Sequence, residues 1–190
     1  MTIRKGVCAS LIGLMTLALL GCAPKMTIEQ MKEMKPVRPA ALDKLNAFAG
    51  EWKGTATMTM AGLDQTLKST GTSKSTWECD GWVLVEHGTM ETEELGSYEM
   101  LGIWTYDPTW KVYRNHWYSS YGEVGEGTAR FDEKTNTWKM KGTTKSEWGT
   151  THGKGTAKFV TDDKVDWSWT ERAMLGLVKV MDMEGTTERK

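Results

Sequence analysis

The residues of this chain that could bind a metal or move a proton begin with its three histidines, His87, His116 and His152. His87 and His116 lie in segments typical of strands, and His152 lies in GTTHGKG, which is typical of a loop. A strand histidine that faces a cavity could ligate haem iron, so haem is one possible cofactor. No two histidines have a close spacing such as H-x-H, so the sequence predicts no metal site. The alternative for each is an ordinary strand or loop histidine.

Patterns for other chemistry are weak. The segment GTSKS at 71–75 lacks the second glycine of the G-x-S-x-G nucleophile motif. The glycines of YGEVGEGT at 121–128 fit no phosphate-binding spacing and instead suit a curved strand. Glu91, Glu93 and Glu94 form an acidic run typical of a solvated turn. The sequence therefore predicts no catalytic residue, and a pocket enzyme that transfers a proton is the minority alternative.

The N-terminus predicts export and lipid attachment. Arg4 and Lys5 precede a short apolar run that ends in LALLGC, residues 17–22. A basic start, a short apolar core and a small residue before the cut are the parts of a secretory signal peptide. The run is too short for a membrane-spanning helix, which needs roughly 20 apolar residues. The cut site resembles a bacterial lipobox, and that resemblance implies that residues 1–21 are removed and that Cys22 carries a diacylglyceryl group and a further acyl chain such as palmitate.

This prediction also implies where in the cell the protein is located and which cysteines remain in the mature chain. Ala23, in the position where Asp would favour retention in the inner membrane, resembles lipoproteins sorted to the outer membrane, facing the periplasm. Removal of Cys8 with the signal and use of Cys22 for lipid leave Cys79, expected to be a small core residue, so no disulfide is predicted. The formal charge changes from −1 to −3 when Arg4 and Lys5 are removed, which gives no basic excess for nucleic acid.

The rest of the chain divides into a tether and one domain. Residues 22–39 contain Pro24, Pro36 and Pro39 and are typical of a flexible tether. Residues 40–190 have the length of a single domain. Its first segment, PAALDKLNAFAGEW, places Leu42, Leu45 and Phe48 at helical spacing and predicts a short helix that ends near Gly50.

From Glu51 onward the chain alternates with a period of two. In EWKGTATMTM, apolar or small residues at 52, 54, 56, 58 and 60 oppose Lys53 and three threonines. Trp138 and Met140 repeat the pattern, as do Val165, Trp167 and Trp169. With turn clusters between them, the segments predict ten strands, near 51–60, 65–78, 82–91, 97–106, 110–119, 123–131, 137–144, 148–159, 164–171 and 177–188.

Ten consecutive antiparallel strands would leave two exposed edges unless the sheet closes. The sequence therefore predicts an all-β fold, an antiparallel up-and-down β-barrel with a short helix before its first strand. The faces opposite the apolar positions are polar, so they do not suit a barrel whose outside contacts lipid.

Three segments carry a family resemblance. FAGEWKG at 48–54 resembles the Gly-x-Trp start of the calycins, the lipocalin-like and fatty-acid-binding barrels. LGIWTYDPTWKVYRNHW at 101–117 and KVMDMEGTTERK at 179–190 add a likeness to a bacterial domain-of-unknown-function family in the lipocalin-like group. A more distant likeness is to nitrobindin-like barrels, whose axial histidine is the model for a haem ligand here. The resemblance implies a lipocalin-like barrel with a possible ligand cavity and Trp52 closing one barrel end.

Tryptophan content supports the functional hypothesis. The chain has 10 Trp against 3 Phe and 5 Tyr, and indole rings in a barrel either fill its core or line a pocket. The first hypothesis is a lipid-anchored envelope protein that binds a small apolar or amphipathic ligand in the barrel cavity. The alternatives are a filled barrel whose rim docks an envelope partner, and, less favoured, a haem-binding barrel or a pocket enzyme. The candidate ligand-binding residues are Trp52, Met58, Trp82, Trp104, Arg114, His116, Trp117 and Trp167.

Overall fold

The computed structural model describes residues 26–190, so the predicted signal peptide and Cys22 lie outside the described part. The chain divides into two compact units at residue 37. Within the first unit, α1 (Ile28–Glu33) begins with a capping box, in which the Thr27 hydroxyl accepts from Gln30 N–H and the Gln30 side chain accepts from Thr27 N–H. None of its residues is buried.

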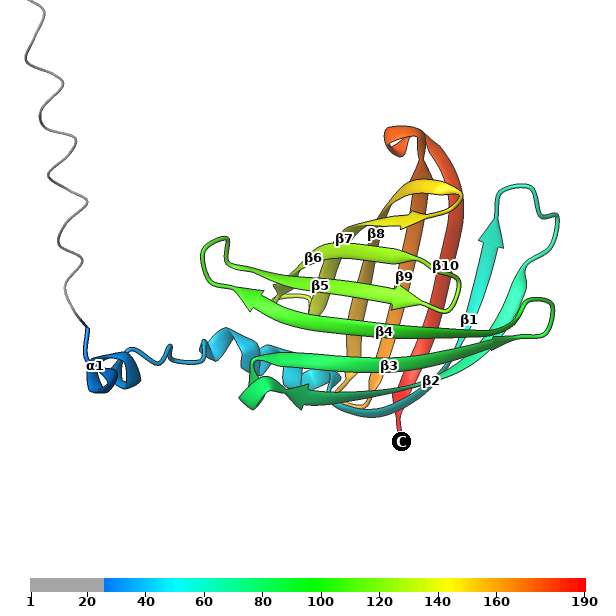
Figure 1. Cartoon of the computed structure of the whole chain (residues 1–190). Coiled ribbons are helices and arrows are strands. Elements are labelled where there is room, and N and C mark those ends of the chain that lie inside the picture. Colours follow the sequence, from blue (N-terminus) through cyan, green and yellow to red (C-terminus); the bar gives the residue numbers. More distant parts are fainter. Residues whose placement is uncertain (1–25) are drawn as a thin grey trace, which may run out of the picture. The chain divides into compact units, whose positions relative to one another are not determined.

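The second unit, Arg38–Lys190, is a closed barrel of ten antiparallel strands in chain order, with β1 paired to both β2 and β10 (Figure 1). This confirms the predicted fold class. The strands are β1 (Gly50–Met60), β2 (Leu67–Glu78), β3 (Val83–Thr92), β4 (Gly96–Asp107), β5 (Val112–Ser119), β6 (Val124–Asp132), β7 (Thr137–Ser146), β8 (Gly149–Thr161), β9 (Lys164–Ala173) and β10 (Val178–Arg189).

The alternation decides which side chains face the interior. Trp52, Ala56 and Met58 of β1 are buried, whereas Lys53 between them is exposed. Because side chains alternate along a strand, one buried residue assigns the face of every second neighbour. Applied to each strand through the buried residues and the register, this rule defines the inner wall.

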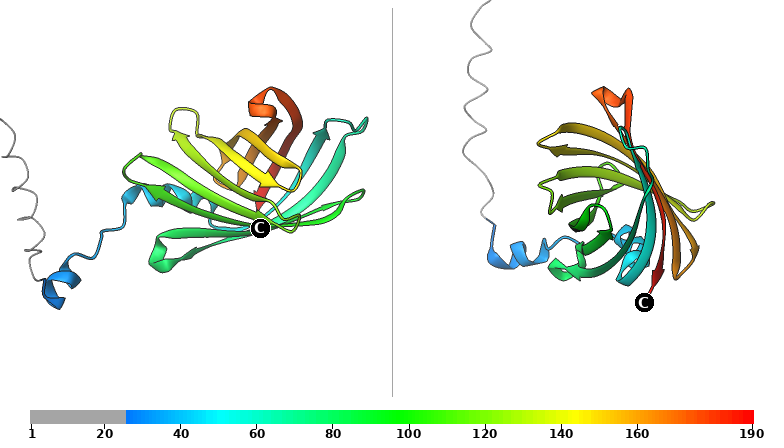
Figure 2. Two further views of the ribbon diagram at one scale, coloured as in Figure 1. Left: turned by 45° about the horizontal axis from the view of Figure 1, so that its top comes forward. Right: turned by 90° about the vertical axis from the view of Figure 1, so that its right-hand side faces the viewer.

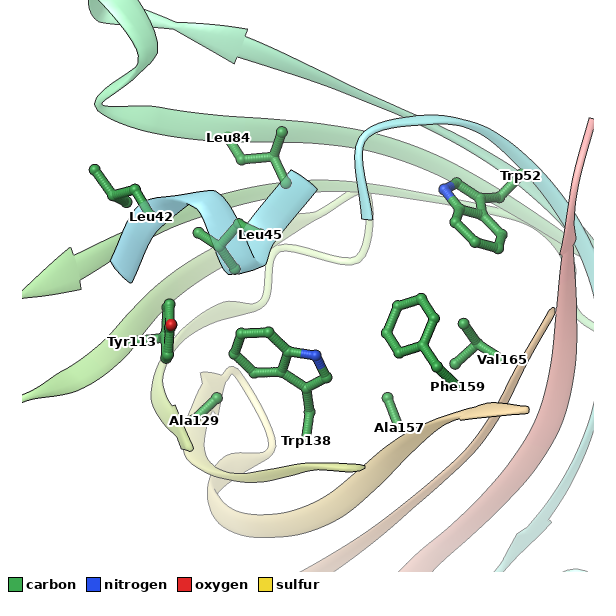
Figure 3. Close-up of a cluster of buried hydrophobic side chains, with 10 residues drawn as sticks. All are labelled: Leu42, Leu45, Trp52, Leu84, Tyr113, Ala129, Trp138, Ala157, Phe159 and Val165. Carbon is green, nitrogen blue, oxygen red and sulfur yellow. The ribbon is translucent and has the colours of Figure 1, made fainter. Parts of the chain in front are cut away.

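A 3₁₀ helix, η1 (Ala40–Phe48), closes one end of the barrel. Leu42, Leu45 and Phe48 are spaced by three residues, and three residues make one 3₁₀ turn, so these side chains share one face. Leu42 and Leu45 are fully buried. Figure 3 shows them among the side chains that we call the plug cluster: Leu42, Leu45, Trp52, Leu84, Tyr113, Ala129, Trp138, Ala157, Phe159 and Val165.

Arg189, at the end of β10, fastens the plug to the barrel. Its guanidinium donates to the carbonyls of Ala49 and Ala47 and forms an ion pair with Asp163 at 2.9 Å. It also lies 4.4 Å from the centre of the Trp52 ring, a cation–π contact. The short helix and the final strand are therefore joined directly at the closed end.

The opposite end carries five loops, which we call the rim: 61–66, 93–95, 120–123, 147–148 and 174–177. β1 starts beside the plug cluster at Trp52, so the loop after β1 lies at the rim. Because consecutive strands run in opposite directions, every second loop after it lies at the rim as well. The turn after β9, drawn in orange, stands at the end of β10 away from the C-terminus (Figures 1 and 2).

The expectation for Cys79 is wrong. It lies in the closed-end turn η2 (Cys79–Gly81), where it is exposed and has a φ of 49°. Three consecutive residues of this turn have positive φ, which turns the chain sharply outside the barrel wall. The position follows from the turn, which the burial preference of cysteine does not predict.

Candidate ligand-binding lumen

The interior beyond the plug cluster, which we call the lumen, is lined by inward-facing side chains that are less completely buried than those of the plug. Trp52 and Trp138, near the plug, are buried, with exposed fractions of 5% and 1%. Trp117 and Trp169, closer to the rim, face inward by alternation but are only partly buried. The inward-facing side chains are therefore packed more tightly near the plug than toward the rim.

Glycines on neighbouring strands let these indoles lie along the wall. Trp117 stands opposite Gly125, and a Cβ at Gly125 would lie 1.8 Å from the Trp117 ring. A Cβ at Gly153 would lie 2.0 Å from the ring of Trp169. A Cβ at Gly185 would lie 2.6 Å from the ring of Trp167, so this indole also lies against a glycine. The rings occupy the volume that other residues would fill with side chains, and so they line the lumen without crossing it.

A carboxylate in the lumen wall, Glu171, follows Trp167 and Trp169 on the inner face of β9. It accepts hydrogen bonds from Thr151 Oγ1 at 2.7 Å and from Trp169 Nε1 at 3.0 Å. A third, from Thr144 Oγ1, is 3.3 Å long. A carboxylate offers about four acceptor positions, so Glu171 is held in place and keeps capacity for a ligand donor.

A second carboxyl group, Glu86, lies on the inner face of β3. Its partners are the side chains of Ser73 and Trp104, and it lies over Gly102. Burial raises the pKa of Glu86 above its ordinary value, and the two hydrogen bonds only partly oppose this effect. Both inner carboxyl groups thus have an indole N–H and at least one hydroxyl as partners.

Glu86 makes stability depend on pH. Because its pKa is raised on folding, the folded protein binds more protons than the unfolded chain in the pH range between about 4.5, the unfolded value, and the higher folded pKa. Stability therefore falls as pH rises from that value through the folded pKa. Glu86→Gln should remove this loss of stability. The loss amounts to about 1.4 kcal/mol in the free energy of unfolding for each unit by which folding raises the pKa of Glu86.

Urea unfolding at about pH 5 and about pH 8 measures this effect. The gain in stability of Glu86→Gln over the native chain should be larger at the higher pH. Glu91→Gln, on the outer face of the same strand, is the control and should show no such trend. An equal effect of Glu86→Gln at both pH values would contradict the prediction.

Nearer the rim, Tyr98 donates a hydrogen bond to Glu123 Oε2 at 3.0 Å, and Ser119 Oγ donates to the same oxygen at 2.9 Å. Burial and the charge of Glu123 raise the pKa of Tyr98 well above its usual range. The phenol therefore stays neutral and acts as a donor near the mouth of the lumen.

The mouth is apolar. Each of the five rim loops exposes a large apolar side chain, with exposed fractions of 42% or more: Leu63, Leu95, Tyr121, Trp148 and, in the turn after β9, Met174, Leu175 and Leu177. Leu175 at 91% is the most exposed of them. Exposed apolar groups gathered at one end of a barrel are typical of a contact or entry surface.

The structure separates the eight predicted ligand-binding residues into three groups. Trp117 faces the lumen, and Trp104 and Trp167 face inward and also pack against the plug cluster. Trp52 and Met58 face inward but are buried, and Trp82 packs against the plug cluster at the closed end. Arg114 and His116 do not line the lumen, because Tyr113 on the same strand faces inward and its alternating neighbours face out.

The histidines do not fit a haem in this barrel. All three are exposed and lie on outward positions of β3, β5 and β8. None of them can therefore supply an axial ligand inside the lumen. Within residues 26–190, no group of three or more His, Cys, Asp or Glu side chains is placed to hold a metal ion. No helix in that range has the length and apolar character to cross a membrane.

Four lumen residues were not among the predicted candidates: Trp169, Glu86, Glu171 and Tyr98. Glu171 shares the period-two face of Val165, Trp167 and Trp169, so the same alternation places it inside. A charged residue on an apolar face is the signal that would have found it. For Glu86 and Tyr98 the alternation of each strand has no such clear apolar face, and the structure was needed.

Comparison with known proteins gives a family and a fold. The family model described as "Protein of unknown function (DUF1579)" matches residues 40–184. The crystal structure of Rv2717c from M. tuberculosis is similar with TM-score 0.61 and 10% identity, covering 81% of this chain and 99% of that chain. A de novo designed, fluorescence-activating β-barrel matches with TM-score 0.43 and 14% identity, covering 78% of this chain and 98% of that chain.

A protein from the DUF3598 family of Nostoc punctiforme matches with TM-score 0.43 and 14% identity over 77% of this chain and 49% of that chain. No curated protein matches the sequence. At 10% identity, the likeness to Rv2717c supports the barrel fold alone. Since the family model covers most of the chain, from η1 through β9 and into β10, this protein belongs to the DUF1579 family.

Proposed function

We propose that the lumen binds a small amphipathic ligand, whose apolar part lies against the indoles and whose cationic or hydrogen-bond-donating group meets the inner carboxylates. The observation that carries this proposal is the position of the Trp117, Trp167 and Trp169 rings over glycines, which lays the indoles along the inner wall of the barrel. Ligand pockets are usually apolar and aromatic with a few fixed polar groups, as here.

The charges of the lumen support the polarity of the ligand. Glu171 faces inward beside Trp169, and Arg189, a cation on an inner position, is held at the closed end by the plug carbonyls and Asp163. A cation near Glu171 would also lie beside the aromatic rings of Trp169 and Trp117, which are 6.3 Å apart. Aromatic rings and carboxylates both attract cations.

Competition between matched amphiphiles tests the proposal. The chain from residue 22, carrying Cys22→Ser, would be loaded with Nile red, an apolar dye, and titrated with decylammonium or decanoate, which share a chain and differ in head charge. Decylammonium should displace the dye at about tenfold lower concentration, a difference of about 1.4 kcal/mol. Glu171→Gln should reduce the difference between the displacing concentrations of decylammonium and decanoate. Glu184→Gln, on the outer face, should leave that difference unchanged.

Equal displacement by both amphiphiles would contradict the cationic preference, and failure of the dye to bind would contradict the cavity itself. Native mass measurement of the gently purified protein is the complementary observation. A discrete adduct would identify the class of the bound molecule.

A second candidate, docking of an envelope partner by a filled barrel, is favoured by the rim. Its loops expose Leu63, Leu95 and Trp148, and the turn after β9 exposes Leu175. Leu175→Asp should weaken a rim contact while leaving dye binding in the lumen intact. Loss of dye binding in this variant would favour the rim as the entrance of the lumen over a partner surface.

We also propose that the protein is anchored by lipid on Cys22 at the outer membrane, facing the periplasm. The lipobox-like LALLGC and Ala23 support this location. Three acyl chains make such anchoring effectively permanent, since each buried methylene contributes about 0.8 kcal/mol. A Cys22→Ser chain should therefore lose the lipid. Cell fractionation and intact mass measure it: recovery of cleaved Cys22→Ser protein in the membrane fraction would contradict the anchor.

A further inference from the structure

A groove on the outer face of the barrel carries basic side chains away from the lumen. It has a volume of about 470 Å³ and lies over β5, β6, β7 and β8. Its basic side chains are Arg114, His116, Lys141, His152 and Lys154, and Glu126 is the acidic one. We call it the outer groove.

Two lysines lie directly opposite each other at its centre. Lys141 of β7 and Lys154 of β8 are cross-strand partners on the same face, and both are exposed. Directly opposed like charges destabilise a sheet. Within residues 26–190, neither lysine has an ion pair with a carboxylate. A bound anion would therefore relieve the repulsion between these two ammonium groups.

Arg114 extends the row of cations. The register places Arg114 opposite Thr128, Thr128 opposite Lys141, and Lys141 opposite Lys154. With about 4.8 Å between strands, the cations extend over roughly 14 Å. Arg114 is oriented by Asp107, which accepts from its Nε at 2.7 Å, so that the Nη atoms are left as donors. At one end the row therefore offers a guanidinium that is ion-paired with Asp107 and keeps its Nη donors, and at the other end two ammonium groups.

The floor of the groove is backbone. Gly127, Gly142 and Gly153 lie between the basic side chains, and the rings of Trp117 and Trp169 lie behind this floor, on the lumen side. The glycines that seat the indoles inside thus also leave the outside open enough for a ligand to approach the wall.

We propose that the outer groove binds a phosphate-bearing anion. Lysine binds phosphate as a point charge, and arginine adds paired N–H donors. The hydroxyls of Thr128 and Thr143, which also line the groove, are further donors. The formal charge of the chain is −1, so this basic face is a local feature and not a consequence of a basic protein. The phosphate belongs either to a soluble compound or to a lipid headgroup, and the inference does not depend on the lumen ligand.

Calorimetric titration of the full chain, in a neutral detergent, with pyrophosphate as the probe tests this proposal. Lys141→Gln combined with Lys154→Gln should raise the Kd about tenfold or more. The matched control combines Lys145→Gln and Lys158→Gln, which make the same charge change on the outer face of the same two strands, outside the groove. The control should keep the native affinity within about twofold.

Absence of pyrophosphate binding to the native chain would overturn the proposal. An equal loss in both double variants would also overturn it, because it would show a response to net charge and not a site. Soluble dihexanoyl phosphatidylglycerol then distinguishes the source of the phosphate. Displacement of pyrophosphate by this lipid supports a headgroup in the groove, and binding of pyrophosphate without displacement supports a soluble phosphate compound.

Discussion

Replacement of Trp138 by alanine should lower the free energy of unfolding by about 3–5 kcal/mol, which is the cost of removing a large buried aromatic side chain. Trp138 is 1% exposed and packs against Tyr113, Phe131 and Phe48, with ring centres 4.6, 5.1 and 5.3 Å away. Its loss would open a cavity between the plug and the sheet. Chemical denaturation of the native and variant chains measures the effect.

Trp138→Phe is the informative partner of this variant. The buried Nε1 of Trp138 has no hydrogen-bond partner, and an unsatisfied donor costs about 1–3 kcal/mol. Phenylalanine removes that donor while it keeps most of the aromatic volume, so Trp138→Phe should cost much less than Trp138→Ala. Similar losses for both variants would show that the indole itself makes a contact that packing does not explain.

Gly125→Ala should have the second large effect, because the added methyl group would lie 1.8 Å from the Trp117 ring. The ring must leave its seat and move into the lumen, at a cost of about 1–3 kcal/mol for overpacking. The same movement should lower the affinity for Nile red, since the displaced indole would occupy space assigned to the ligand. Unfolding and dye titration measure the two effects.

Gly88→Ala is the matched control for this substitution. It is also an inward glycine of the barrel wall, but the nearest side-chain atoms to its Cβ would be at 3.7 Å, an ordinary contact. It should change stability by less than about 1 kcal/mol and leave dye binding unchanged. If Gly125→Ala behaves like Gly88→Ala, the indole does not lie on the glycine, and the proposed lumen site loses its main support.

Strand periodicity in the sequence was sufficient to predict the barrel. The face of Trp52, Ala56 and Met58 and the face of Trp167 and Trp169 are the inner faces that the structure shows. The spacing of Leu42, Leu45 and Phe48 predicts a short helix, and the structure has the 3₁₀ helix η1 there. These features depend on neighbours along the chain, so they can be predicted without the tertiary structure.

The direction of Arg114 and His116 could not be determined in the same way. β5 carries large side chains on both faces, Val112 with Arg114 and His116 on one and Tyr113 with Asn115 and Trp117 on the other. A period of two separates these sets but does not say which set faces in. Closure of the sheet and packing of Tyr113 against the plug decided it.

The register between strands decided which glycines the indole rings lie on and which side chains the carboxylates contact. Gly125 meets Trp117 from the next strand, and Glu171 collects donors from Thr144 and Thr151, which are 27 and 20 residues earlier. The lysine pair of the outer groove arises in the same way. Since a shift of one residue in register would send each side chain to the opposite face, the sequence by itself determined the barrel and its alternating faces, and only the closed tertiary structure decided which side chains meet.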